Sequence, residues 1–295
     1  MNQNSKDIVS HEFIAIDEGF GNLIYVNENI PAQNWIVPIG HPQARDMQLI
    51  GKNRVLLSHH NGYTEFDIET GGVVKEFKAL QGVTAARRQS NGNTIVAGVN
   101  IANTRGVVVL ELNGDDAIIH RSVFPGDYVR LIRQTPAGTY LMSCNDRIRE
   151  GSRDGKYLRE FQMEGFYHAW KAVQLANGNV IVSAGYGAFM AEFDSSGGVL
   201  RKFCTKKSVP SEVNPFFYAM FQLLPNGHIV LANWQGHGPG LGSSGIQLLE
   251  FDCFGTIVWR WHNAGLISSL QGVLVLDGLD KMKLHDEQHG VMQPI

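Results

Sequence analysis

The sequence lacks paired cysteines and clusters of basic residues. Its 295 residues include only three cysteines, Cys144, Cys204 and Cys253, which are far apart and form no C-x-x-C pair. A disulfide framework and a cysteine zinc site are therefore not expected. The chain has 25 Lys and Arg against 28 Asp and Glu, for a formal net charge of −3. Sequence-independent binding to nucleic acid needs a basic stripe, and none is visible.

Long apolar segments are missing as well. The longest apolar runs are much shorter than a membrane span, and the first residues, MNQNSKDIVSHEF, have no apolar region of the signal-peptide kind. We expect a soluble, cytoplasmic protein that binds neither nucleic acid nor membranes. If a signal peptide was removed before this sequence begins, the expected location becomes the periplasm or the exterior. These features carry no signal for an oligomeric state.

What the sequence does contain is a recurring unit of alternating strands and turns. The stretch LANGNVIVSAGYGAFMAEFDSSGGVLRKF, from Leu175 to Phe203, is its clearest copy. The first half of the unit recurs in residues 48–62, 87–100, 132–146 and 221–236. The second half recurs in residues 63–77, 149–161 and 247–261. Copies are about 40 to 50 residues apart, a period typical of propellers and solenoids.

Each copy predicts four short strands. Apolar residues alternate with polar ones, as in strands that are half buried, and the recurring Asn-Gly predicts a type I′ hairpin turn. One four-stranded sheet cannot cover both of its faces, but sheets stacked in a ring can. The sequence therefore predicts an all-β, six-bladed β-propeller, with seven blades as the alternative if the N-terminal segment is divided differently. The six inner strands are expected to begin near Asp46, Thr84, Tyr128, His168, Tyr218 and Ser269.

The two ends of the chain are expected to share one blade. Residues 268–280 supply an inner strand with little after it, whereas residues 13–26 begin at a second strand. The predicted organisation is an N-terminal tail at 1–12, a single propeller domain at 13–280 and a C-terminal tail at 281–295. The acidic stretch 276–290 is interpreted as solvated.

Departures from the repeat indicate where chemistry would occur. Loops that enter the inner strands and loops between second and third strands lie on one face of a propeller, and this sequence places histidines, aromatics and amides there. Candidate catalytic residues are His60, His168, His237, Tyr128 and Asp46. Candidate substrate-binding residues are Arg45, Arg130, Asn100, Asn145, Trp170, Tyr186, Tyr218, Trp234, Gln235 and Gln271, with Phe217 and Glu18 nearby.

The residue types suggest roles. Histidine titrates near neutrality and suits proton transfer, arginine holds carboxylates in a bidentate fork, and aromatic faces with amide edges suit sugar rings. Three imidazoles from His60, His168 and His237, with an oxygen from Gln235, Asp46 or Glu18, would form a divalent-metal site. The alternative is that these histidines bind backbone groups or a ligand. No Gly-x-Ser-x-Gly motif of a serine nucleophile is present, but Cys144 follows a second strand near the candidate face and is a further candidate nucleophile.

The repeats resemble those of the quinoprotein-like bacterial β-propellers, through "VIVSAG", "AEFD" and "LLEFDCFGTIVWRW". The resemblance covers nearly the whole chain at the level of the repeat and implies the fold more than an activity. Relatives that carry a quinone cofactor have more blades, a docking tryptophan in each and vicinal cysteines, so a quinone is not expected here. The chain is also similar to oligogalacturonate-lyase-type propellers, which place histidines and a glutamine around the channel.

We expect an enzyme that acts on a sugar or sugar-derived metabolite at the channel mouth by histidine-assisted proton transfer, with or without a divalent metal. Elimination, isomerisation and hydrolysis all fit the residues. The alternative is a non-catalytic propeller that binds a carbohydrate or a partner protein. A pocket with convergent polar groups would favour the enzyme, and a closed, shallow channel would favour the binding protein.

Overall fold

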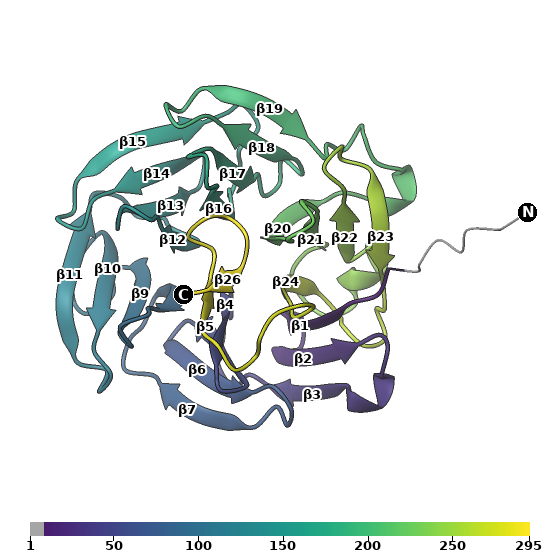
Figure 1. Cartoon of the computed structure of the whole chain (residues 1–295), viewed down its shortest axis with the longest axis horizontal. Coiled ribbons are helices and arrows are strands. Elements are labelled where there is room, and N and C mark those ends of the chain that lie inside the picture. The colour runs from purple at the N-terminus through teal and green to yellow at the C-terminus, as the bar shows by residue number, and fades with distance from the viewer. Residues whose placement is uncertain (1–8) are drawn as a thin grey trace, which may run out of the picture.

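The chain folds into six four-stranded antiparallel sheets arranged around a central axis (Figure 1). This computed structural model describes residues 9–295. The architecture confirms the predicted all-β, six-bladed β-propeller. Most of the N-terminal tail predicted at 1–12 lies outside the described residues.

Each blade runs from an inner strand at the axis to an outer strand at the rim. The first three blades in chain order are β4(Met47–Gly51), β5(Arg54–His59), β6(Gly62–Asp67), β7(Val73–Phe77); β8(Val83–Arg88), β9(Thr94–Val99), β10(Val107–Leu112), β11(Ile118–Phe124); and β12(Ile132–Gln134), β13(Tyr140–Cys144), β14(Arg147–Gly151), β15(Tyr157–Gln162). The next two are β16(Lys171–Gln174), β17(Val180–Ser183), β18(Met190–Phe193), β19(Val199–Phe203); and β20(Phe217–Leu223), β21(Ile229–Trp234), β22(Leu248–Phe251), β23(Ile257–Trp261). Three short 3-10 helices lie in the loops, η1(Pro31–Gln33), η2(Ser211–Val213) and η3(Leu241–Ser244).

The sixth blade closes the ring with strands from both ends of the chain. Its order is β24(Leu270–Val275), β1(Glu12–Asp17), β2(Asn22–Asn27) and β3(Trp35–Pro38). Strand β1 pairs antiparallel with β24, with Phe13 opposite Val275 and Ile14 opposite Leu274. The expectation that the two ends share a blade is confirmed.

The Asn-Gly turns have a different geometry from the one predicted. In the loop after β16, the Gly178 amide donates to the Leu175 carbonyl at 2.9 Å, and only the glycine has positive φ, at 87°. Asn177 keeps negative φ and accepts the Asn179 amide on its side chain at 3.0 Å. This is a type I turn followed by a glycine bulge, which joins twisted strands as well as a type I′ turn does.

The core lies between neighbouring blades. One cluster joins Leu56 and Tyr63 of one blade to Val83, Val96 and Val108 of the next, and all five are fully buried. Inner strands such as β20 and β24 are buried along their whole length, whereas outer strands such as β19 remain mostly exposed. Burial of each large apolar side chain contributes about 1.5 to 3 kcal/mol, so stacking of the blades stabilises the ring.

The C-terminal segment crosses the centre of the ring (Figure 1). It forms the two-stranded sheet of β25(His285–Asp286) and β26(Gln293–Pro294), and Leu284 bridges to Ile50 at the end of β4. Asp277 and Asp280 of the acidic stretch are exposed, as expected, but the interpretation as solvated is wrong for Asp286 and for Glu287, which is 1% exposed. Its charge is offset by cations of the inner strands, which the local pattern does not reveal. The predicted boundaries at 13–280 and 281–295 stay a prediction.

Residues 9–295 contain no helix that is long and apolar enough to cross a membrane.

Candidate functional site

The loops on one face of the ring converge on a small pocket at the channel mouth, which we call the mouth pocket. Its volume is about 100 Å³. Its lining residues come from five of the six blades and the loops that enter them: Arg45, Arg130, His168, Trp170, Tyr186, Phe217, Trp234, His237 and Gln271. All nine were candidates from the sequence, because the ring brings the same loop of each repeat to the same face. Their functional roles stay a prediction.

Two arginines meet in the mouth pocket without a carboxylate. Within residues 9–295, neither Arg45 nor Arg130 forms an ion pair, although both line the pocket. Burial, and then the positive charge of Arg130, lowers the pKa of Arg45 to about 10. The Arg130 guanidinium lies 4.6 Å from the ring centroid of Tyr128 and 5.6 Å from that of Trp170. Stacking on these rings therefore holds the Arg130 charge near that of Arg45, and an anion between the two arginines would relieve their repulsion.

Several buried polar atoms around the pocket have no hydrogen-bond partner. They include Nε of Arg130, Nε1 of Trp170, Nε1 of Trp234 and Oε1 of Gln271. The two tryptophans are 3% exposed and Gln271 is 5% exposed. An unsatisfied buried polar group costs about 1 to 3 kcal/mol, so several such groups around one cavity indicate a site that is completed by a polar ligand.

His168 is held in an uncommon backbone conformation at the edge of this pocket. Its φ is 56°, in the left-handed region that non-glycine residues seldom adopt. Its amide donates to Oδ1 of Asn145 at 3.2 Å, and the neighbouring turn needs Gly185, since a Cβ there would lie 2.3 Å from the His168 carbonyl oxygen. Local strain of this kind is often concentrated at ligand sites.

The imidazole of His168 is paired with a phenol. Its Nδ1 hydrogen-bonds to the Tyr128 hydroxyl and also faces Nη2 of Arg130 at 3.5 Å. Because arginine can only donate, we assign Nδ1 as the acceptor, which leaves the proton of the neutral ring on Nε2. Burial, and then the charge of Arg130, lowers the pKa of His168, whereas burial raises the pKa of Tyr128 to about 12. At neutral pH the pair is uncharged and able to accept a proton.

His237 lines the same pocket from the loop between β21 and β22. Its Nδ1 is 2.8 Å from Oε1 of Glu18, and its ring contacts Trp234 edge to face at 4.5 Å between centroids. The side chain is 74% exposed. The glycine-rich loop that follows Trp234 thus places an imidazole paired with a carboxylate beside the Trp234 ring.

Other predicted residues do not reach the mouth pocket. Strand neighbours point to opposite faces, so Phe217 lines the pocket while Tyr218 is fully buried between blades. Asp46 is also fully buried, with its carboxylate 2.8 and 2.9 Å from the guanidinium of Arg133. Gln235 is 6% exposed and donates to the Asn214 carbonyl at 3.0 Å.

The predicted three-histidine metal site is not formed. Within residues 9–295, no three His, Cys, Asp or Glu side chains are grouped so that they could hold a metal ion. His60 contacts Oε1 of Gln43 at 3.2 Å and lies outside the mouth pocket. His168 and His237 are turned toward Tyr128 and Glu18. The candidate nucleophile Cys144 is buried, and burial raises the pKa of its thiol to about 12, so it is not activated.

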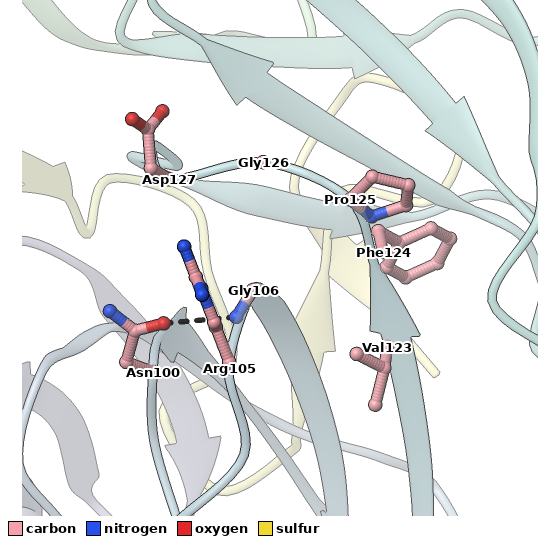
Figure 2. A pocket seen from close by; sticks show the side chains of 8 residues that line it. All are labelled: Asn100, Arg105, Gly106, Val123, Phe124, Pro125, Gly126 and Asp127. Carbon is pink, nitrogen blue, oxygen red and sulfur yellow. Dashed lines mark hydrogen bonds between the residues drawn. The ribbon is translucent and has the colours of Figure 1, made fainter.

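Two larger grooves lie on the same face beside the mouth pocket. The first, of about 680 Å³, is lined by loop residues that include Asn100, Arg105 and Asp127 (Figure 2). Asn100 is bonded to the Gly106 amide at 2.9 Å and shapes its loop, while Arg105 extends into the groove (Figure 2). Sequence reasoning missed Arg105 and Asp127, although both interrupt the repeat.

The second groove, of about 430 Å³, shares Gly126 and Asp127 with the first and includes Tyr128 and Asn145. Because the Tyr128 hydroxyl is bonded to His168, this groove adjoins the mouth pocket. Sequence reasoning also missed Arg147 and Arg149, which line it. Their signal was weak, since charged residues at a strand start are usually solvated.

Comparison with known proteins identifies the fold. No protein-family model matches the chain, and no curated protein matches it. Its structure is similar to a protein of unknown function from Bacteroides caccae, with a TM-score of 0.74, 20% identity, and coverage of 90% of this chain and 99% of that one. It is also similar to virginiamycin B lyase from Staphylococcus aureus (TM-score 0.55, 11% identity, 89% and 87% coverage).

A third similar structure is the calcium-binding protein regucalcin from Agrobacterium tumefaciens, with a TM-score of 0.51, 12% identity, and coverage of 76% of this chain and 82% of that one. At identities this low, the similarity shows the β-propeller fold alone. Membership of the quinoprotein-like family, predicted from the repeats, stays a prediction.

Proposed function

We propose that this protein is an enzyme that binds a small hydroxylated carboxylate, such as a sugar acid, in the mouth pocket and removes a proton from it. The observation that carries the proposal is the pair Arg45 and Arg130, two cations that converge in one pocket without a carboxylate. A bidentate carboxylate is the ligand that arginine binds best.

The remaining pocket groups suit the rest of such a ligand. Trp170, Phe217 and Trp234 offer apolar faces to a sugar ring, and the free Nε1 atoms of the two tryptophans can donate to its hydroxyls. Oε1 of Gln271 can accept from another hydroxyl. Because the volume of the mouth pocket is only about 100 Å³, it would take the carboxylate and the part of the ring next to it, with the remainder in the adjoining groove.

Proton transfer would proceed through the Tyr128 and His168 pair. The Tyr128 oxygen takes a proton from the substrate as its own proton passes to Nδ1 of His168, so the positive charge comes to rest on the imidazole. Arg45 and Arg130 stabilise the negative charge that develops next to the carboxylate. This chemistry fits a lyase or an isomerase. Lyases occur among the similar structures, and one was crystallised as a catalytically inactive histidine-to-alanine variant with quinupristin.

Ligand binding is tested by thermal shift with a matched pair, D-galacturonate and D-galactose, which differ in the carboxylate. We expect galacturonate alone to raise the melting temperature, because a ligand that binds only the native state stabilises it. Arg130→Met should abolish the shift. Arg260→Met, in an exposed pair on the outer strand β23, is the control and should keep it. Equal shifts with both sugars would refute the carboxylate site.

Catalysis is tested separately by proton NMR in deuterated water with the carboxylates that bind. The enzyme should form product or exchange a carbon-bound proton, and Tyr128→Phe should bind normally but lose this activity by about 100-fold or more. Binding without turnover by the wild type would refute the enzyme and favour the alternative, a carbohydrate-binding propeller.

A further inference from the structure

The channel contains a second set of converging cations, on the inner strands below the mouth pocket. Arg87 on β8, Arg133 on β12 and Lys171 on β16 come from the inner strands of three consecutive blades. All three are buried, at 3%, 2% and 2% exposure. The inner strands of the other blades carry uncharged amides near the axis, such as Gln48 and Gln222. Positive charge is thus gathered on one side of the channel.

Two adjacent carboxylates of the C-terminal segment lie among these cations, Asp286 beside Arg87 and Glu287 beside all three. Oε1 of Glu287 is 2.5 Å from Nζ of Lys171, and its Oε2 is 2.6 Å from Nε of Arg133 and 3.9 Å from Nη2 of Arg87. Glu287 is 1% exposed. Removing a charge from water is costly unless partners replace the water, and here three cations do so.

The surroundings show a built binding site and not a chance contact. Asp46 neutralises Arg133 from the other side, and Asp286 pairs with Arg87, so the three cations face three anions. Nε of Arg87 is buried and has no hydrogen-bond partner. The site therefore has a donor that Glu287 does not use.

The segment that delivers Glu287 is attached to the inner strands on both sides of this residue. Nε2 of Gln48 donates to the His285 carbonyl at 2.8 Å, and Val291 bridges to Leu223. Between these attachments, Glu287 reaches the cations as the side chain of a turn closed by the Gly290 amide at 2.9 Å. The C-terminal segment thus holds the Glu287 carboxylate in the position that a bound carboxylate ligand would take.

We infer that the interior of the channel, below the mouth pocket, contains a binding site for a small carboxylate, and that the protein's own Glu287 fills it in cis. Arg87, Arg133 and Lys171 form the site, and the C-terminal segment serves as a stopper that this site holds in place. With Glu287 seated, the channel is closed below the mouth pocket, and ligands reach the axis only from the mouth. This inference does not depend on the proposed function.

The test is chemical rescue in the full-length chain. Glu287→Ala leaves an excess of buried positive charge and should lower the melting temperature by about 10 °C. Formate and acetate should restore much of this loss in a saturable way, because they replace the missing carboxylate. Acetamide, and chloride at equal ionic strength, should not. In the wild type Glu287 already fills this site, so formate and acetate should give at most the small shift caused by binding in the mouth pocket, and this shift is subtracted from the rescue of the variant.

A matched control and a second readout complete the experiment. Glu212→Ala removes an exposed carboxylate that pairs with Arg260, and it should change the melting temperature by less than about 2 °C without a response to formate. If Glu287→Ala does not fold, Glu287→Gln keeps the shape, and tryptic cleavage after the exposed Lys283 should become at least about tenfold faster than in the wild type. Unchanged stability and cleavage, or equal rescue by acetamide, would overturn the inference.

Discussion

His11 links the blade formed by β24, β1, β2 and β3 to the neighbouring blade, and its charge makes this contact sensitive to pH. Its Nδ1 lies 2.5 Å from Oδ2 of Asp277, and its Nε2 lies 2.8 Å from Oε2 of Glu250 on β22. Burial alone would lower the pKa of His11, but hydrogen bonds and charges of these two carboxylates outweigh it and raise the pKa from 6.5 to about 9. The imidazolium, which directly precedes β1, is therefore paired with Asp277 after β24 and with Glu250 of the neighbouring blade.

The sign and size of the effect follow from this pKa. A group whose pKa is raised on folding stabilises the native state fully below its unfolded pKa, and the contribution is lost as pH rises through the folded value. For His11 it is present below about pH 6.5 and lost by about pH 9. At about 1.4 kcal/mol per pH unit the upper bound is about 3 kcal/mol, and partial screening by solvent reduces our expectation to about 2 kcal/mol.

The assay compares wild type with His11→Gln, which keeps a polar side chain but does not titrate. Melting temperatures or urea midpoints are measured at pH 6 and pH 9.5. The wild type should be more stable than the variant by about 2 kcal/mol at pH 6, and the difference should vanish at pH 9.5. Lys171, whose pKa burial lowers to about 8, also titrates in this range with the opposite sign, but it cancels in the comparison. A difference that does not change with pH would refute the reasoning.

Two further predictions concern the glycines and the cysteines. Gly185→Ala should destabilise the protein by roughly 3 kcal/mol, because its Cβ would lie 2.3 Å from two carbonyl oxygens. Gly227→Ala, with a similar positive φ of 82° but open space around it, should cost about 1 kcal/mol in the same denaturation assay, and equal losses would contradict the steric argument. In the native protein a thiol reagent should label the exposed Cys253 alone, since Cys144 and Cys204 are buried with thiol pKa values raised to about 12. Mass spectrometry counts the labels, and more than one on the folded protein would contradict this burial.

The fold was predictable from local patterns. Each strand and turn recurs at the same place in the unit, so the blade can be recognised in one copy and counted in the others, and the order β24, β1, β2, β3 follows from incomplete copies at the two ends. The turn type was wrong, because Asn-Gly suits more than one hairpin. A type I turn with Gly178 in the bulge serves here.

The loops that form the mouth pocket were predictable, and all nine lining residues were candidates. The sequence did not separate them from neighbouring candidates that lie outside the pocket. Arg45 and Phe217 line it, while their strand neighbours Asp46 and Tyr218 are fully buried. Which of two adjacent residues faces the axis depends on register, and a shift of one position exchanges them. The metal site with His60 fails because each histidine has its own neighbour, such as Gln43 for His60, and no local pattern reports such pairings.

By itself, the sequence determined the strands, the number of blades and the closure of the ring, since these follow from periodicity and turn residues within about 45 residues. Only the tertiary structure decided that Arg45 and Arg130 meet without a carboxylate, and that Glu287 lies buried among Arg133 and Lys171. The physical reason is distance along the chain. Charges that are 85 to 154 residues apart become neighbours only when the ring forms. Their burial and Coulomb energy depend on separation in space and not along the chain.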